Sequence, residues 1–192
     1  MKFTAGKLII VIFLVITIII ALVFFNKQRV SGYENDNLNY EQFILEKTNK
    51  MKELLINHKI TGIDKIIGRN IRKDFRTIFL YSGNDCGKCI SKGFQIIKYI
   101  DSLYNDPPLY VISSNSNISA DMINYDYSNF IYLDKNDLIR TELKFLYTPV
   151  FLVINREDII KDIHFILPLK DSEKEITDIK YSLISLIKNQ TF

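Results

Sequence analysis

The sequence predicts an α/β domain carried on a single N-terminal membrane anchor, and three observations lead to this fold class. Residues 8–25 form one continuous apolar run. From residue 77 onward, short β-branched and aromatic runs alternate with segments whose apolar residues recur at helical spacing. The two cysteines of the chain lie where the first of these predicted strands passes into the first long predicted helix.

The apolar run Leu8–Phe25 is long enough to serve as the anchor. Only Thr17 and Ala21 interrupt its Ile, Leu, Val and Phe residues. At about 1.5 Å per residue, such a helix nearly crosses a hydrocarbon core of about 30 Å. A cleaved signal peptide usually has a shorter apolar core, of about 7–15 residues, followed by a small-x-small site. Residues 24–29 offer no such site, so we expect an anchor that is retained rather than a cleaved signal peptide.

The orientation of the anchor follows from its flanks and from the cysteines. Lys2 and Lys7 precede the run and Lys27 and Arg29 follow it, so the positive-inside bias is slight. A short N-terminal tail favours a cytosolic N-terminus. Disulfide chemistry belongs outside the cytosol. We therefore expect a single-pass protein whose C-terminal domain is extracytoplasmic, on the periplasmic or cell-surface side.

The charge balance argues against one class of partner. Lys2 and Lys7 account for two of the 25 Lys and Arg residues, and the remaining 23 nearly balance the 22 Asp and Glu residues. A domain so close to neutrality has no basic footprint for nucleic acid. With 47% apolar residues, the chain of 192 residues can still bury a core of ordinary size.

We divide the chain into an anchor over residues 1–29, a tether with an amphipathic helix over 30–59, and an α/β domain over 60–192. The amphipathic helix is predicted at Leu38–Asn57, with an apolar stripe made of Ile44, Thr48, Met51 and Leu55. The stripe is too short for a coiled coil. We expect the helix to lie on the domain or to space it from the membrane, and a partner-binding helix is the other interpretation.

The segment before the cysteines contains two predicted strands. A short strand is expected around Ile63–Ile67, followed by a turn at Gly68. The run Thr77–Ser82 predicts a buried strand, and Gly83-Asn84-Asp85 predicts a turn. After the cysteines, helical spacing places one apolar face toward the core, formed by Ile90, Phe94, Ile97, Ile100 and Tyr104.

Cys86 and Cys89, separated by Gly-Lys, therefore open a helix directly after a strand. The unpaired N–H groups and the positive dipole end of a helix N-terminus favour a thiolate at the first cysteine. The second sulfur lies one helical turn away and can close a disulfide. A structural disulfide across so short a loop stabilises little. A metal site needs about four ligands, and His58 and His164 lack ligand spacing. We interpret the pair as redox-active and expect no metal and no cofactor.

The remaining segments continue the alternation of strands and helices to the C-terminus. Asn105–Pro108 ends the long helix. The elements predicted before Thr148 are a strand at Leu109–Ser113, a short helix at Ala120–Tyr125, an extended piece at Phe130–Leu133 and a helix at Asp137–Tyr147. Those predicted after Pro149 are a strand at Val150–Ile154, a hairpin return at Ile159–Phe165 and an amphipathic helix at Ser172–Asn189.

This order of elements, with Cys-x-x-Cys at a helix start and Thr148-Pro149 before a strand, resembles the thioredoxin-like fold. The membrane-anchored, extracytoplasmic thiol-disulfide oxidoreductases and redoxins are the most similar group. The resemblance spans about residues 77–189 and implies a sandwich with a central mixed β-sheet flanked by helices. It also implies that Cys86 attacks, that Cys89 resolves, and that a cis Pro149 with Thr148 holds an extended substrate backbone. On propensity alone Pro149 is a trans proline that starts a strand, because only about 5–6% of X–Pro bonds are cis.

Several departures from the family pattern concern the chemistry of the pair. Asp85 stands where the family usually has Trp, Gly-Lys replaces Gly-Pro, and Leu80 occupies the position of the buried acid of thioredoxins. We expect the Asp85 carboxylate to raise the pKa of Cys86, and the helix N-terminus with Lys88 to lower it. The two effects nearly cancel. They predict a modestly lowered pKa and a protein that acts as a reductant.

The predicted function is therefore a membrane-anchored thiol-disulfide oxidoreductase. It reduces protein disulfides outside the cytosol and is itself reduced by a redox donor protein. The alternative, of a different class, is a redox-inert thioredoxin-fold module that binds a partner near Pro149. A peroxidase is a weaker interpretation, because peroxiredoxins surround the reactive cysteine with Pro and Thr, and residues 82–85 contain neither. A copper-delivering relative would space its two cysteines by three residues.

Overall fold

The computed structural model describes residues 17–23, 40–68, 74–144, 146–168 and 172–188. The chain divides into two compact units, Met1–Glu46 and Lys47–Phe192. In the first unit residues 17–23 are helical, and most of the predicted anchor Leu8–Phe25 lies outside the described residues. Within these described ranges, no helix combines the length and the apolar character needed to cross a membrane.

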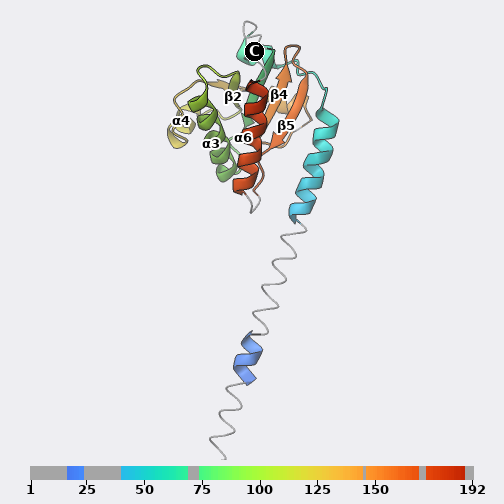
Figure 1. Ribbon diagram of the computed structural model, residues 1–192, viewed down its shortest axis with the longest axis vertical. Coiled ribbons are helices and arrows are strands. Elements are labelled where there is room, and N and C mark those ends of the chain that lie inside the picture. The colour runs from blue at the N-terminus through green and yellow to red at the C-terminus, as the bar shows by residue number, and fades with distance from the viewer. Residues whose placement is uncertain (1–16, 24–39, 69–73, 145, 169–171, 189–192) are drawn as a thin grey trace, which may run out of the picture. The chain divides into compact units, whose positions relative to one another are not determined.

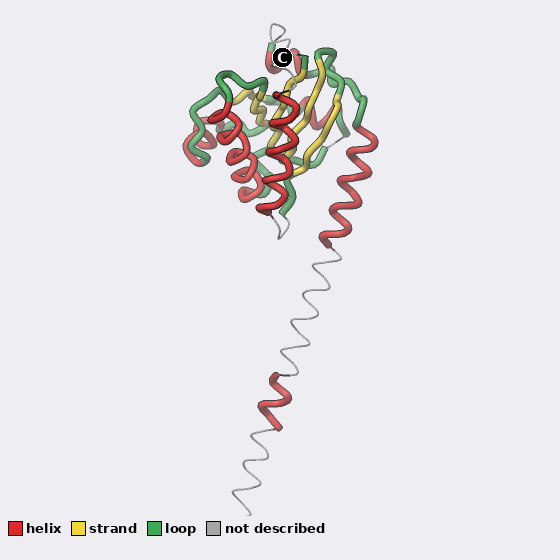
Figure 2. Tube along the Cα trace, in the orientation of Figure 1, coloured by secondary structure: helices red, strands yellow, loops and turns green. Residues whose placement is uncertain are grey.

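A five-stranded mixed sheet forms the centre of the second unit (Figures 1 and 2). Its strands are β1 (Phe75–Tyr81), β2 (Leu109–Ser113), β3 (Ile131–Leu133), β4 (Val150–Asn155) and β5 (Ile160–Phe165), in the spatial order β3-β2-β1-β4-β5. β2 is parallel to β1 and β3, whereas β4 is antiparallel to β1 and β5. β1 is central and buried along almost its whole length. A strand covered on both faces needs apolar residues on both, which explains its continuous apolar run.

Helices cover both faces of this sheet, and the strand residues alternate between them because successive side chains point to opposite faces. The first face packs against α3 (Gly87–Leu103) and α6 (Ser172–Lys188), which lie side by side in Figure 1, and its strand residues include Phe79, Tyr81, Val111, Phe151 and Val153. The second face packs against α2 (Ile63–Ile67), α5 (Leu138–Glu142) and the end of a helix over residues 40–55, and its strand residues include Ile78, Leu80, Ile112, Leu152 and Ile154. This is the mixed sheet flanked by helices that the resemblance implied.

Close packing of α3 on β1 fixes the position of the cysteine segment. The rings of Phe79 and Phe94 meet edge to face, with 5.6 Å between their centroids. Gly93 lies against the same contact, and a Cβ atom there would overlap the Phe79 ring. Ile90, Phe94, Ile97 and Ile100 are all buried, as their spacing predicts. The N-terminus of α3 is thereby held at the end of the central strand.

The predicted strand at Ile63–Ile67 is wrong, because these residues form the helix α2. A short apolar run can be read with either periodicity. Here Ile63 and Ile67, four residues apart, share one helix face and are buried. Two preceding N–H groups, of Thr61 and Gly62, donate to the Glu142 carboxylate over 2.6 and 3.0 Å. A carboxylate at this end satisfies helix donors that otherwise lack partners, and such long-range capping leaves no local sequence signal.

The helix predicted at Asp137–Tyr147 is shorter than expected, since α5 ends at Glu142. The chain reverses at Lys144, whose φ of 56° is left-handed, and no Gly or Pro marks the site. Leu143 and Leu146, which follow the helix, are nevertheless buried. The other elements begin and end within a few residues of the predicted bounds, among them the helix over residues 40–55 and α4 (Ile118–Asn124). At the β4–β5 turn, Asp158 adopts a φ of 65°, the conformation for which glycine is usual.

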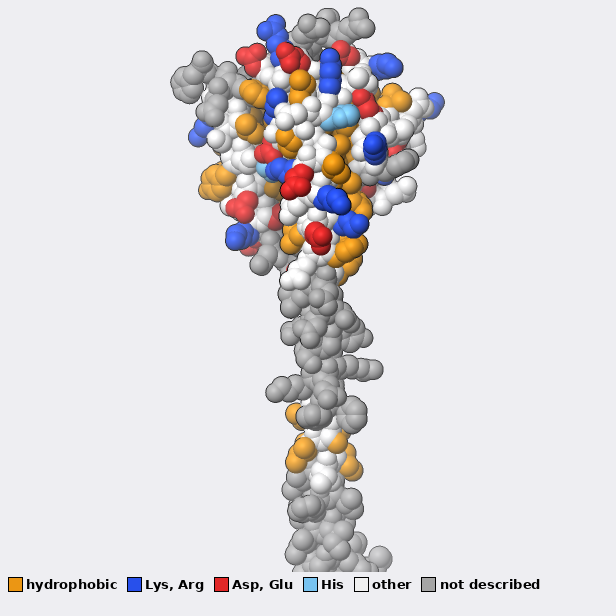
Figure 3. Space-filling model, turned by 90° about the vertical axis from the view of Figure 1, so that its right-hand side faces the viewer, with side chains coloured by type: hydrophobic (Ala, Val, Ile, Leu, Met, Phe, Trp, Pro, Cys, Tyr) orange, Lys and Arg blue, Asp and Glu red, His pale blue; other side chains and the backbone are white. Residues whose placement is uncertain are grey.

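Charges of both signs mix on the surface of the domain. On the face shown in Figure 3, the described Lys and Arg side chains are interspersed with Asp and Glu. Proteins that follow a nucleic-acid backbone present a basic stripe or patch instead. The described side chains on this face form no such stripe.

Candidate active site

The two cysteines lie at the carboxyl end of β1, where the chain turns into α3. Cys86 is the N-cap residue of α3, with φ −58° and ψ 115°, and its side chain is exposed. Cys89 is one helical turn further and only 1% exposed. Both are free thiols. The pair therefore consists of one sulfur that a large substrate can reach and one that is sheltered behind it.

The surroundings of Cys86 favour its thiolate. The pKa of Cys86 is lowered, chiefly because the Cys89 thiol donates a hydrogen bond to its sulfur. Partial burial opposes this shift, whereas the backbone N–H groups of Cys89 and Lys88 and the charge of Lys92 add to it. The contribution of the helix N-terminus is the one predicted from sequence. Lys88 acts through its backbone N–H, and its side chain is exposed.

The surroundings of Cys89 favour its thiol. Burial raises the pKa of Cys89 to about 12, and its hydrogen bond to Cys86 and the charge of that residue add to the rise. Lys92 opposes the rise, while Glu175 contributes to it. The geometry thus divides the pair into an ionisable, accessible Cys86 and a protonated, sheltered Cys89.

Two hydrogen bonds hold the Asp85 carboxylate in place. One of its carboxylate oxygens accepts a hydrogen bond from the Ser82 N–H over 2.7 Å, and the other accepts one from the Thr148 hydroxyl over 2.7 Å. Burial raises the pKa of Asp85 itself, against the lowering effect of these hydrogen bonds. Asp85 therefore links the cysteine turn to the Thr148 loop.

The Thr148–Pro149 segment lies beside the cysteine turn because of the strand register. β4 begins at Val150, which pairs with Leu80 near the end of β1. The peptide bond between Thr148 and Pro149 is cis, as the resemblance implied. The Pro149 carbonyl accepts a hydrogen bond from the Ile166 N–H over 3.0 Å, which holds the segment against the end of β5. The structure thus assembles Asp85, both cysteines and Thr148-Pro149 at one edge of the sheet.

Sequence reasoning missed an ion pair beside the cysteines, in which Lys92 acts on both sulfurs and Glu175 acts on Cys89. Lys92 Nζ lies 3.4 Å from Glu175 Oε2, and the two side chains are only 14% and 18% exposed. Lys92 also donates to the Leu167 carbonyl over 3.0 Å, and Glu175 accepts from the Leu167 N–H over 2.9 Å. The position of Lys92, one turn after Cys89, was a usable signal. Glu175 comes from α6 and was not foreseeable, because only the packing of α6 on α3 brings it there.

This ion pair also bears on one departure from the family pattern. Leu80 is fully buried in the second face of the sheet. The carboxylate whose charge acts on Cys89 comes instead from Glu175.

Histidines do not assemble with the cysteines. His164 Nε2 lies 3.0 Å from Asp162 Oδ2 and 3.3 Å from the Ser182 hydroxyl, on β5 and α6. His58 is exposed, beyond the end of the helix over residues 40–55. In the part of the chain that the structure describes, no three His, Cys, Asp or Glu side chains are grouped so that they could hold a metal ion.

Comparisons with known proteins gave distant structural likenesses and no family. No family model matches the sequence, and no curated protein is similar to it. Among solved structures, the thioredoxin domain of a thiol-disulfide oxidoreductase from Bacteroides vulgatus is 9% identical, with a TM-score of 0.47 over 60% of this chain and 81% of that one. StoA from Bacillus subtilis is 15% identical, with a TM-score of 0.40 over 56% and 85%. Peroxiredoxin Q from Xanthomonas campestris is 9% identical, with a TM-score of 0.44 over 59% and 80%. These structures are a thioredoxin domain, StoA and a peroxiredoxin, and at these identities and TM-scores each likeness is distant.

Proposed function

We propose that this protein is a thiol-disulfide oxidoreductase that works through Cys86 and Cys89. One observation carries the proposal: an exposed thiol with a lowered pKa accepts a hydrogen bond from a buried thiol that keeps its proton. The thiolate is the attacking species in disulfide exchange. A purely structural pair has no need of this division between an accessible thiolate and a sheltered thiol.

The reaction follows from the two roles. The Cys86 thiolate attacks one sulfur of a substrate disulfide and forms a mixed disulfide, and the other substrate sulfur leaves as a thiolate and takes up a proton. The charge on Cys86 is then gone, and with it two of the causes that raise the pKa of Cys89. Cys89 loses its proton and attacks the Cys86 sulfur. The second substrate sulfur leaves as a thiolate and takes up the proton from Cys89, and the protein keeps a Cys86–Cys89 disulfide. The protein has then donated two electrons and one proton, and the proton on the first substrate thiol comes from the solvent.

The surrounding charges favour the reducing direction. A strongly oxidising member of this chemistry owes its potential to a highly stabilised reduced form. Here Lys92 stabilises the Cys86 thiolate, but its charge is partly offset by Glu175 at 3.4 Å. A cation that is itself paired stabilises a thiolate less than an unpaired one does, so we expect electrons to pass from the pair to a substrate disulfide. A redox donor protein then restores the two thiols. In this proposal the Glu175 carboxylate limits the stabilisation of the Cys86 thiolate, a role that the prediction from sequence gave to Asp85.

The Thr148-Pro149 segment is the proposed support for the substrate backbone. Asp85 ties it to the cysteine turn through the Thr148 hydroxyl. The segment lies next to β1, whose end carries the cysteines. An extended substrate strand laid along Pro149 presents its disulfide to Cys86.

We propose further that residues 8–25 anchor the protein in a membrane with the domain outside the cytosol. The length of the apolar run and the preference of disulfide chemistry for oxidising compartments support this. An impermeant maleimide added to intact, mildly reduced cells should label Cys86. Labelling that requires lysis would place the domain in the cytosol, and a soluble form lacking the run would identify a cleaved signal.

A trapping experiment tests the redox proposal. In a Cys89→Ser variant, Cys86 should remain joined to its substrates as mixed disulfides, which reducing agent releases. The matched Cys86→Ser variant should trap far less, because its remaining sulfur is buried. Equal trapping by the two variants, or none by either, favours the redox-inert binding module instead.

A further inference from the structure

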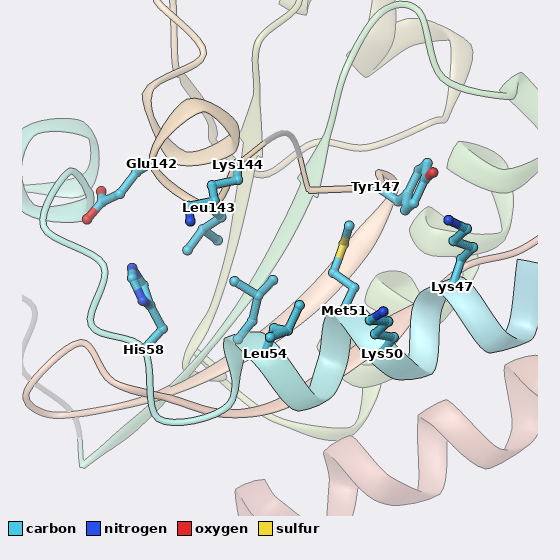
Figure 4. A pocket seen from close by; sticks show the side chains of 10 residues that line it. Lys47, Lys50, Met51, Leu54, His58, Glu142, Leu143, Lys144 and Tyr147 are labelled. Atoms are coloured by element: carbon cyan, nitrogen blue, oxygen red, sulfur yellow. The ribbon is translucent and has the colours of Figure 1, made fainter.

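A pocket lies beside the candidate active site, between the end of the helix over residues 40–55 and the segment that follows α5. Its volume is about 430 Å³, within the range of pockets that hold a small ligand. Figure 4 shows Met51 and Leu54 extending from the helix toward Leu143, with Lys47 and Tyr147 near the other end. All of these residues belong to the second compact unit.

The pocket is apolar at its floor and leaves large apolar side chains in water. Leu55 and Leu143 are buried, and Met51 is half-buried between them and the opening. Leu54 is 73% exposed and Tyr147 is 51% exposed. Exposed apolar surface gathered around a concavity marks a place where another molecule binds.

The charge around the pocket is positive. Lys47, Lys50 and Lys144 line it, and all three are exposed. Among its described lining residues, Glu142 is the one carboxylate, and both of its oxygens are already engaged. Oε1 accepts from the N–H and the hydroxyl of Thr61 over 2.6 and 2.8 Å, and Oε2 accepts from the Gly62 N–H over 3.0 Å. An occupant that complements this pocket is therefore acidic at its rim and apolar at its centre.

The location of the pocket connects it with the proposed substrate path. Tyr147 directly precedes Thr148, whose hydroxyl donates to Asp85 beside Cys86. A chain that lies along Pro149 can thus continue into the pocket at its Tyr147 end. A freely diffusing small molecule would gain nothing from this continuity, whereas a protein substrate gains a second point of contact.

We propose that the pocket selects substrates, by binding a segment in which an apolar side chain is flanked by acidic residues. The proposal rests on the proposed function, since that function makes the substrate a protein with an extended segment at Pro149. The apolar side chain enters between Met51, Leu55 and Leu143, and the flanking carboxylates lie near Lys50 and Lys144.

Peptide binding tests this directly. The probe is a short, fluorescein-labelled, cysteine-free peptide whose Leu-Phe centre is flanked by glutamates, and the matched peptide carries lysines instead. Anisotropy is measured with the full chain in detergent. We expect the acidic peptide to bind and its affinity to fall with salt. A Lys50→Glu/Lys144→Glu double variant should weaken binding about tenfold, since two rim charges are each reversed. Leu54→Ser, an exposed change that spares the fold, should weaken it by a further factor of about three to ten, as lost apolar contact predicts.

The controls separate this proposal from the redox function. Lys98→Glu alters an exposed lysine on α3, on the opposite face of the sheet, and should leave the affinity unchanged. Equal affinity for the acidic and basic peptides, no binding of either, or equal binding by the double variant overturns the pocket proposal. Oxidation and reduction by dithiothreitol are followed on the same samples. Cycling without peptide binding overturns the pocket proposal and leaves the redox function standing. Binding without cycling overturns the redox function, and with it the role of the pocket in selecting redox substrates, and leaves only a peptide-binding pocket.

Discussion

Glu175→Gln tests how a residue of α6 affects the redox behaviour of the Cys86–Cys89 pair, which lies at the start of α3. The substitution removes one negative charge and keeps an oxygen that can accept from the Leu167 N–H. Lys92 is then left without its 3.4 Å partner. The thiolate of Cys86 should be better stabilised, and the protein should become more oxidising.

The size of the shift can be worked from the structure. Lys92 lies one turn from Cys89, so their side chains start about 5–6 Å apart, and the carboxylate of Glu175 lies just beyond the ammonium group. If the Glu175 carboxylate is taken to lie about 8 Å from the thiolate, its charge contributes roughly 2 kcal/mol at an effective dielectric constant of about 20. Because Cys86 is exposed, solvent screening reduces this by about half. A change of about 1 kcal/mol corresponds to a pKa lower by about 0.7 and a potential higher by about 20 mV.

The assay is equilibration of the full chain with dithiothreitol at pH 8, together with thiolate absorbance against pH. Glu173→Gln is the matched control, since it makes the same change at an exposed position on α6. Lys92→Met should shift both quantities in the opposite direction. If Glu175→Gln behaves like Glu173→Gln, or shifts the potential downward, then the ion pair does not tune the pair of thiols and the argument for the reducing direction fails.

Three further predictions concern packing, substrate contact and pH. Gly93→Ala should lower the free energy of unfolding in urea by about 1–3 kcal/mol, because overlap with Phe79 outweighs the better helix propensity of alanine. Thr148→Val should raise the KM for a peptide disulfide several-fold while leaving the potential unchanged, because it cuts the tie to the cysteine turn. Asp162→Asn should lessen the loss of stability below about pH 5. Burial alone raises the pKa of Asp162, but hydrogen bonds from His164 and Lys52 outweigh it and hold the pKa well below its ordinary value of 3.8.

The sign of the pH prediction follows from linkage. A carboxyl group whose pKa is depressed in the folded state stabilises the fold above its unfolded pKa, and this share is lost as the pH falls toward the folded pKa. Wild type should therefore lose more stability than Asp162→Asn between pH 6 and pH 3, and equal losses would refute the assignment.

For the packing prediction, Gly87→Ala is the control, since a Cβ there meets open space. For substrate contact, an unchanged KM in Thr148→Val would show that the tie has no part in binding.

Much of the fold could be predicted because its strands are marked by composition. Leu109–Ser113 was predicted with its observed bounds, since two prolines precede an apolar run and polar residues follow it. The inward face of α3 followed from spacing alone. The Ile63–Ile67 helix was misread, because five residues are too few to show a period and its N-terminal cap comes from Glu142, far along the chain.

The residues of the candidate site could be predicted from the sequence, whereas the charges that act on its cysteines could be predicted only in part. The motif and the resemblance identified Cys86, Cys89 and Pro149. However, the neighbourhood of Asp85 and Cys86 in the sequence does not reveal where the Asp85 side chain points. Its carboxylate accepts a hydrogen bond from the Thr148 hydroxyl, 63 residues away. One of the charges that act on Cys89 comes from Glu175, on a helix whose docking no local pattern encodes.

A redox titration of the full chain tests the central claim most directly. The protein is equilibrated with dithiothreitol or glutathione buffers over a range of potentials and quenched with acid. The Cys86–Cys89 disulfide is then quantified from the mass of the alkylated protein. A reversible two-electron transition is expected, with a midpoint near that of reducing thioredoxins, about −270 mV, and well below the oxidising value of about −120 mV. The claim is contradicted if no intramolecular disulfide forms at any buffer ratio. It is also contradicted if the midpoint potential lies below about −300 mV, the range of structural disulfides.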